Sequence, residues 1–179
     1  MDLPPLFLYQ PLRALAARLP AGAPPGVAEM DAAVARMGRP VGPGGLPIRF
    51  CAEVDSGAYE SRIASSGVVH TREGSWHDTF HALIWLGFPR AKAALTERHL
   101  RHDAGPGAAR GPVRDAATQF DEDGVLVLHA DAELAQLLRE RRWVAAFWER
   151  RARMREALLC VVFGHALLDK LRAPFFGLC

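Results

Sequence analysis

Residues 75–87 read SWHDTFHALIWLG and predict a buried helix with a defined start. Ser75 is a good N-cap, because its hydroxyl can accept a hydrogen bond from the amide three residues on. Asp78 can reach back to the Ser75 amide and complete a capping box. The residues that follow are apolar on most sides of the helix, which is typical of a helix inside a protein. Gly87 and Pro89 then end the segment.

The rest of the chain predicts further helices and little sheet. Apolar residues recur at helical spacing in residues 12–19, 27–37, 90–101, 131–158 and 161–171. Residues 113–129 predict a β-hairpin that turns at Asp123-Gly124, and residues 48–52 predict a strand. We therefore expect a helix-dominated α+β fold, in which buried helices pack with one small hairpin or sheet.

The 179 residues are enough for one domain with an appendage. Residues 38–47 hold four Gly and three Pro, so residues 1–46 predict a helical arm and linker, and residues 47–179 a single globular domain. The chain closes on an apolar segment, residues 173–179. This predicts either a native chain that extends beyond Cys179 or an end that docks into the core.

Composition excludes several classes of protein. Half of the residues are hydrophobic, which excludes a disordered chain, and no apolar run is long enough to span a membrane. Basic and acidic residues number 22 and 20, so no overall charge points to nucleic acid. The three cysteines are far apart, which argues against a disulfide framework or a thiolate zinc site. With no signal-peptide pattern at the N-terminus, we expect a cytoplasmic protein without a membrane partner.

Arginine makes up 20 of the 22 basic residues, and seven arginines lie between Arg139 and Arg155. Glutamates interrupt this run, and Trp143 and Phe147 lie at helical spacing beside it. The pattern is that of a solvated helix face over an apolar stripe, which makes a nucleic-acid helix the weaker interpretation.

Histidines carry the first candidate site. His77 and His81 lie four residues apart, so on a helix both imidazoles can converge on one metal ion. His165, followed one turn later by Asp169, is a candidate third ligand. The alternative is that these histidines are core residues that hydrogen-bond to backbone or carboxylate groups. The sequence leaves both open.

Three arginines lie among apolar and acidic residues rather than in the Arg-rich run: Arg62, Arg72 and Arg114. A guanidinium can bind a phosphate or carboxylate through two hydrogen bonds, so these residues are candidates for binding a small anionic substrate. The alternative is structural ion pairing with Glu60, Asp115 or Asp121.

Five motifs in order resemble a bacterial family called domain of unknown function 3025. They are YESRI at 59–63, TR at 71–72 with WHDTF at 76–80, FPRAK at 88–92, RDAATQFDE at 114–122, and GHAL at 164–167. The resemblance covers most of residues 47–179 and implies no established activity. The family pattern has Asn at the position of His81, which counts against a site built on His77 and His81 alone. It has Glu at the position of Asp169, which keeps a carboxylate there.

These motifs are polar and specific in residue type, whereas a core tolerates any apolar residue of suitable size. We therefore expect a pocket in which His77, His165, Asp121 and Glu122 are catalytic and Arg72, Arg114 and Arg62 bind substrate. His77, His81 and His165 are the candidate ligands of a divalent transition metal, and a metal-assisted hydrolase or other small-molecule enzyme is the leading hypothesis. The alternative is a non-catalytic binding or protein-interaction module whose polar motifs are structural.

Overall fold

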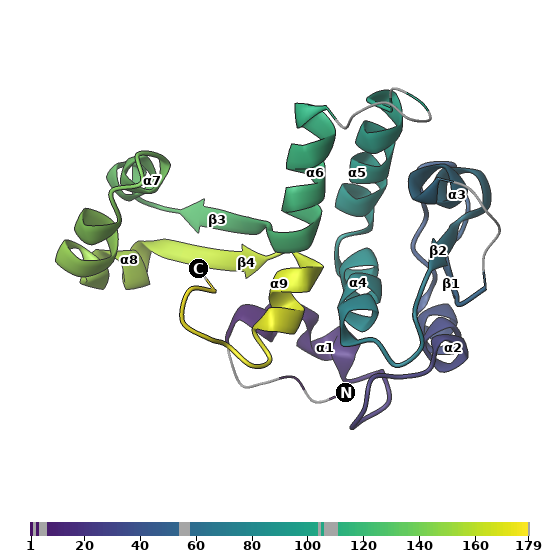
Figure 1. The fold of residues 1–179 in the computed structure, drawn as a ribbon. Coiled ribbons are helices and arrows are strands. Elements are labelled where there is room, and N and C mark those ends of the chain that lie inside the picture. The colour runs from purple at the N-terminus through teal and green to yellow at the C-terminus, as the bar shows by residue number, and fades with distance from the viewer. Residues whose placement is uncertain (2, 4–6, 54–57, 104, 106–110, 179) are drawn as a thin grey trace.

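The computed structural model describes residues 1, 3, 7–53, 58–103, 105 and 111–178. The fold is a helix-dominated α+β arrangement, as predicted, with two separate two-stranded sheets (Figure 1). The helices are α1 (Arg13–Ala16), α2 (Val27–Met37), α3 (Tyr59–Ser66), α4 (Trp76–Gly87), α5 (Pro89–Arg101), α6 (Pro112–Asp123), α7 (Ala132–Arg139), α8 (Arg151–Ala157) and α9 (His165–Lys170), with a 3₁₀-helix η1 (Phe7–Leu12) and a π-helix η2 (Ala145–Glu149). The strands are β1 (Arg49–Cys51), β2 (Val68–His70), β3 (Val125–His129) and β4 (Leu158–Val162).

Helix α4 is the centre of the molecule, as its sequence predicts. One side of it, including Phe80 and Leu83, packs with η1, α1 and α9 in the first apolar cluster. Its other side, including Ala82 and Trp85, packs with α2, β1 and β2 in a second cluster. Burial of both sides explains why this helix has no polar face outside its first turns.

Of the two hydrogen bonds in the capping box predicted for α4, the one to the Ser75 hydroxyl is confirmed and the one to the Ser75 amide is wrong. The Ser75 hydroxyl accepts from the Asp78 amide at 3.2 Å, as expected. The Asp78 carboxylate does not reach back to the Ser75 amide. It accepts from the backbone amide, Nε and Nη2 of Arg72 at 2.6, 3.0 and 2.8 Å. Hydrogen bonds from a guanidinium are charge-assisted and therefore stronger than one from a neutral amide.

The N-terminal region packs onto this centre. Tyr9 is fully buried, stacks on Phe80 and donates its hydroxyl to the Leu168 carbonyl at 2.7 Å. Helix α2 has the predicted bounds and ends at Gly38, whose φ of 89° favours glycine. Strand β1 pairs in parallel with β2, and the predicted strand at 48–52 is confirmed at Arg49–Cys51.

The hairpin predicted at 113–129 is wrong. Residues 112–123 form helix α6, and only 125–129 form a strand. Val113, Ala117 and Phe120 are spaced for a helix face, and Pro112 is well placed at the first turn. Asp123-Gly124 ends this helix instead of turning a hairpin. Gly124 is required because a Cβ there would lie 2.2 Å from the Phe120 carbonyl oxygen.

The long helix predicted from Asp131 to residue 158 is also wrong, because it is divided into α7, η2 and α8. Asp131 does cap α7, but Arg141 has a φ of 55°, which interrupts the helical path. Residues 158–162 then form β4, antiparallel to β3, so the helix predicted at 161–171 begins only at His165. The residues of β4 are apolar or β-branched and fit a strand once a partner strand is present.

The β3–β4 ribbon extends away from the body and carries α7 and α8 at its far end (Figure 1). This end has its own small apolar cluster, which includes Leu134, Leu137 and Met154. At the C-terminus, Phe175 and Phe176 are 62% and 108% exposed, so the expectation that this end docks into the core is wrong for them. Cys179 lies outside the described residues.

None of the helices in the described residues combines the length and apolarity that a membrane crossing requires. Cys51 and Cys160 are free thiols.

Candidate functional site

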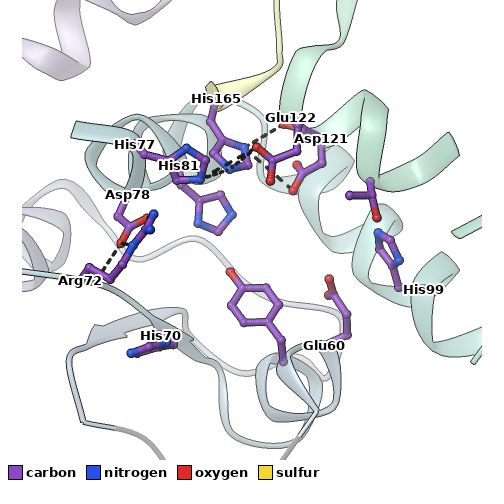
Figure 2. A pocket seen from close by; sticks show the side chains of 12 residues that line it. Glu60, His70, Arg72, His77, Asp78, His81, His99, Asp121, Glu122 and His165 are labelled. Carbon is purple, nitrogen blue, oxygen red and sulfur yellow. Dashed lines mark hydrogen bonds and ion pairs between the residues drawn. The ribbon is translucent and has the colours of Figure 1, made fainter. Parts of the chain in front are cut away.

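A pocket of about 280 Å³ lies where α3, α4, α5, α6 and α9 meet. Figure 2 shows His77, His81 and His165 together on one side of it, with Asp121 and Glu122 beside them. Twelve residues line it: Tyr59, Glu60, His70, Arg72, His77, Asp78, His81, His99, Thr118, Asp121, Glu122 and His165. The pocket is thus lined mainly by polar and titratable side chains, which is unusual for the interior of a small domain.

His165 is held in one tautomer by the backbone. Its Nδ1 lies 2.8 Å from the carbonyl oxygen of Asp121. A carbonyl can only accept, so Nδ1 carries the proton and Nε2 keeps a free lone pair. That Nε2 lies 3.1 Å from the Nε2 of His77. The lone pair of His165 is therefore directed at the second histidine.

Glu122 completes a triangle with these two nitrogens. Its Oε2 lies 3.6 Å from the Nε2 of His165 and 3.9 Å from the Nε2 of His77. Tetrahedral zinc with ligands at 2.0–2.1 Å keeps neighbouring ligand atoms about 3.3 Å apart. The three atoms are therefore arranged closely enough to bind one ion after small side-chain movements.

His81, Asp121 and His165 form a second group of nearby ligand atoms, all within 4.8 Å of one another. The Asp121 carboxylate is already engaged, because both of its oxygens accept from Lys92 Nζ at 2.6 and 2.8 Å. His81 is buried and its ring centroid lies 4.5 Å from that of His165. The group of His77, Glu122 and His165 is therefore the better candidate metal centre.

Burial sets the proton affinity of these groups. Desolvation lowers the pKa of His165 to about 4 and holds the pKa of His81 well below its usual value. Both imidazoles are then neutral near pH 7, the form that binds metals. Desolvation also raises the pKa of Glu122, although the nearby His77 opposes that shift.

Of the three arginines predicted to bind substrate, the structure places only one in the pocket. Arg72 lines the pocket, but its guanidinium is bound by Asp78. Arg62 and Arg114 do not line it. Arg114 pairs with Asp103 at 2.8 Å, and not with any of the carboxylates expected from the sequence. Helix α6, which the hairpin prediction missed, directs the Arg114 side chain toward the end of α5 instead of into the pocket.

Asp169 is likewise outside the pocket and pairs with Arg172 at 3.1 Å. His165 is the first residue of α9, so its side chain extends beyond the start of that helix toward α6. Asp169 lies one turn further along α9, so its side chain does not reach the pocket.

Sequence reasoning missed several lining residues and one supporting residue: Tyr59, Glu60, His70, His99, Thr118 and Lys92. Lys92 had a usable signal, because it is one of only two lysines in an arginine-rich chain. It is 4% exposed, and His99 lies two turns further on the same face of α5. Thr118 and Glu122 share a face of α6, a spacing that the hairpin prediction concealed.

Fold and pocket together define a helix-dominated α+β protein with a histidine- and carboxylate-lined site. The profile of the family described as "Protein of unknown function (DUF3025)" matches residues 48–179, and the chain belongs to that family. The matched region includes every residue that lines the pocket. Neither the curated proteins nor the solved structures gave a match.

Proposed function

We propose that this protein is a cytoplasmic metal-assisted hydrolase in which His77, His165 and Glu122 hold one divalent transition metal ion. The observation that carries the proposal is the convergence of three ligand atoms, with separations of 3.1, 3.6 and 3.9 Å. Imidazole nitrogen with one carboxylate oxygen is a donor set that suits zinc and its first-row neighbours.

The surroundings of the three atoms support a catalytic site over a structural one. Structural zinc sites are closed by four protein ligands, whereas catalytic sites leave a position for water. Here two imidazoles and one carboxylate line an open pocket, and the Asp121 carbonyl orients His165 in the way that outer partners orient metal-bound histidines. A bound metal would supply a water of lowered pKa that attacks an electrophilic carbon.

Tyr59 is the candidate hydrogen-bond donor to the substrate. Although 37% of Tyr59 is exposed, its hydroxyl is desolvated in the pocket, which raises the pKa of the hydroxyl well above the usual value, and the carboxylates of Glu60, Asp121, Asp78 and Glu122 act in the same direction. The hydroxyl therefore stays protonated at neutral pH and can donate to a substrate carbonyl oxygen. In the hydrolysis, water adds to that carbonyl carbon, the bond to the leaving oxygen or nitrogen breaks, and the leaving group takes the proton.

Metal content of the purified, untagged protein tests the proposal. We expect about one zinc or related ion per chain by elemental analysis, lost in His77→Ala and in Glu122→Gln. His129→Ala is the matched control, because His129 is exposed on β3 and lies outside the pocket. Protein that folds normally but takes up no ion from a metal-containing buffer would rule out the metal-assisted hydrolase.

One observation favours the second candidate, a non-catalytic interaction module. Trp143, Phe147 and Trp148 are 52%, 58% and 69% exposed at the end of the β3–β4 ribbon, where such side chains are typical of a binding surface. Under this alternative the polar pocket is structural. The His77→Ala variant would then lose folding stability without any change in metal content, since the wild-type protein would hold no metal.

A further inference from the structure

The pocket has a second group of polar residues that the proposed metal centre does not use. Glu60 comes from α3, His99 from α5 and Thr118 from α6, and all three line the same pocket. Figure 2 shows Glu60 and His99 across the pocket from Arg72, with the histidine cluster between the two sides. A ligand that reaches His77 and Glu122 can therefore also extend to these residues.

Each of these residues has a buried polar atom without a hydrogen-bond partner. They are Oε2 of Glu60, Nδ1 of His99 and Oγ1 of Thr118. His99 as a whole is only 5% exposed. Within the part of the chain that the structure describes, five side-chain atoms are unsatisfied in this way, and three of them belong to this one pocket. Leaving such an atom unpaired costs about 1–3 kcal/mol, so three in one cavity point to a ligand that pairs them.

The charges around the pocket indicate the sign of that ligand. Arg72 neutralises Asp78, and Lys92 neutralises Asp121. Among the described residues, no cation pairs with Glu60, so its carboxylate remains an uncompensated acceptor. The arginines that were expected to bind an anion are paired elsewhere or lie outside the pocket. Among the described residues around the pocket, neither Arg72 nor Lys92 is therefore left to receive the anionic group that the sequence predicts, and at the Glu60 end, away from the proposed metal, the unpaired group is a carboxylate.

We infer that Glu60, His99 and Thr118 bind a protonated primary amine of the substrate. An ammonium has three N–H donors and no acceptor, which matches a carboxylate oxygen, an imidazole lone pair and a hydroxyl oxygen. His99 accepts when its proton is on Nε2, and the Thr118 oxygen has lone pairs in any rotamer. Pairing the ammonium with Glu60 adds charge to the hydrogen bond, which makes it stronger than a neutral one.

Taken with the proposed function, on which this step rests, the two groups define a substrate class. The amine would lie at Glu60 while a carbonyl group lies at His77 and Glu122. The cavity of about 280 Å³ is at the lower end of the range for small-molecule sites. The substrate is accordingly a small amine-bearing ester or amide, rather than a phosphate ester or a long peptide.

Binding of simple probes to chelator-treated, metal-free protein tests the amine site alone. The probes are butylammonium and butyrate, which differ in the sign of the charge on a similar chain. We expect saturable binding of butylammonium, followed by calorimetry and by the imidazole NMR signal of His99, and at least tenfold weaker binding of butyrate. No saturable binding of butylammonium, or equal binding of butyrate, overturns the inference.

Two variants localise the binding. Glu60→Gln keeps the size of the side chain and removes its charge, and Thr118→Val removes one acceptor with little change in shape. Each should weaken butylammonium binding, Glu60→Gln by at least tenfold. Glu97→Gln is the control, because Glu97 lies on α5 but pairs with Arg101 at the surface. Unchanged binding in Glu60→Gln, with its fold verified by circular dichroism, also overturns the inference.

The two proposals fail separately. Amine binding to a protein that never takes up metal removes the metal-assisted hydrolase and leaves the amine site. Metal uptake without amine binding removes the amine site and leaves the metal-assisted hydrolase.

Discussion

The Nε2 atoms of His77 and His165 lie 3.1 Å apart, although 88 positions separate the two residues in the chain. Their approach follows from the packing of α9 against α4, which the buried apolar residues of the first cluster stabilise. Because the Asp121 carbonyl fixes the tautomer of His165, the contact is directional. With the Nδ1 proton of His165 directed at Asp121, the Nε2–H of His77 is the donor and Nε2 of His165 the acceptor of this hydrogen bond.

Gly164 sets the distance between this contact and Glu122. A Cβ at position 164 would lie 2.5 Å from the Glu122 carbonyl oxygen and 2.6 Å from the Asp123 Cα, both backbone atoms. We therefore predict that Gly164→Ala forces α6 and α9 apart, lowers the free energy of unfolding by about 1–3 kcal/mol and weakens binding of the metal ion proposed above. Urea unfolding and metal titration measure the two effects.

The control for this prediction is Gly111→Ala. Gly111 precedes α6 with a φ of −87°, and a Cβ there would meet nothing within 4 Å. Gly111 is the N-cap of α6, as Gly164 is of α9, and alanine is the poorer N-cap, so we expect a loss of about 0.5–1 kcal/mol, smaller than that of Gly164→Ala. Equal effects of the two substitutions would contradict the assignment of Gly164 as a spacing residue.

The Asp121–Lys92 ion pair should be important for stability. The Lys92 side chain is 5% exposed, so Asp121→Asn leaves a buried ammonium without its counter-charge. We predict a loss of about 3 kcal/mol in the free energy of unfolding at pH 7, measured in urea. The neighbouring Asp123 pairs with Lys170 at the surface, and Asp123→Asn should cost less than about 1 kcal/mol. A small effect of Asp121→Asn would show that water reaches Lys92.

Stability of the metal-free protein should depend on pH between about 4 and 6.5. In this range an unfolded chain binds a proton at His165, whereas the folded chain, with a pKa of about 4, does not. Stability is then full above pH 6.5 and falls as the pH drops toward 4, by about 1.4 kcal/mol for each pH unit. His81 acts in the same direction.

Thermal or urea unfolding across this range, after metal removal, measures the effect. His165→Gln should flatten the curve, and the exposed His129→Ala should leave it unchanged. A wild-type curve that is flat from pH 6.5 to 4 would contradict the burial of neutral histidines.

The arginine run should not bind nucleic acid. Arg150 and Arg153 are engaged with Glu133, and Arg153 also with Asp131, so part of the positive charge is compensated on the surface itself. We predict that a 20-base-pair DNA duplex shows no micromolar affinity in fluorescence anisotropy at about 50 mM salt. Tight binding that weakens steeply with added salt would contradict this reading.

The features of the fold that could be predicted from the sequence are those set by residues close together in the chain. The cap at Ser75, the apolar surface of 76–87 and the end of α2 at Gly38 depend on neighbours in the chain, and the structure has all three. The second arm of the predicted hairpin is confirmed as β3, but its partner was missed, because β4 begins at Leu158, 33 positions after Val125, and forms a strand by pairing with β3. Each segment alone has an ambiguous pattern, and a helix was the default for the second one.

In the candidate site, too, some features could be read from the sequence and others depend on the tertiary structure. Sequence alone identified His77, Asp121, Glu122 and His165 as polar residues worth attention, since their types and motif positions can be read along the chain. Only the tertiary structure decided which atoms meet: the Asp121 carbonyl, rather than its carboxylate, orients His165, and Lys92 takes the carboxylate. It also separated Arg62, Arg114 and Asp169 from the pocket and brought Glu60 and His99 into it. The physical reason is that a side chain's partner is set by helix packing across distant segments, which no spacing along one segment encodes.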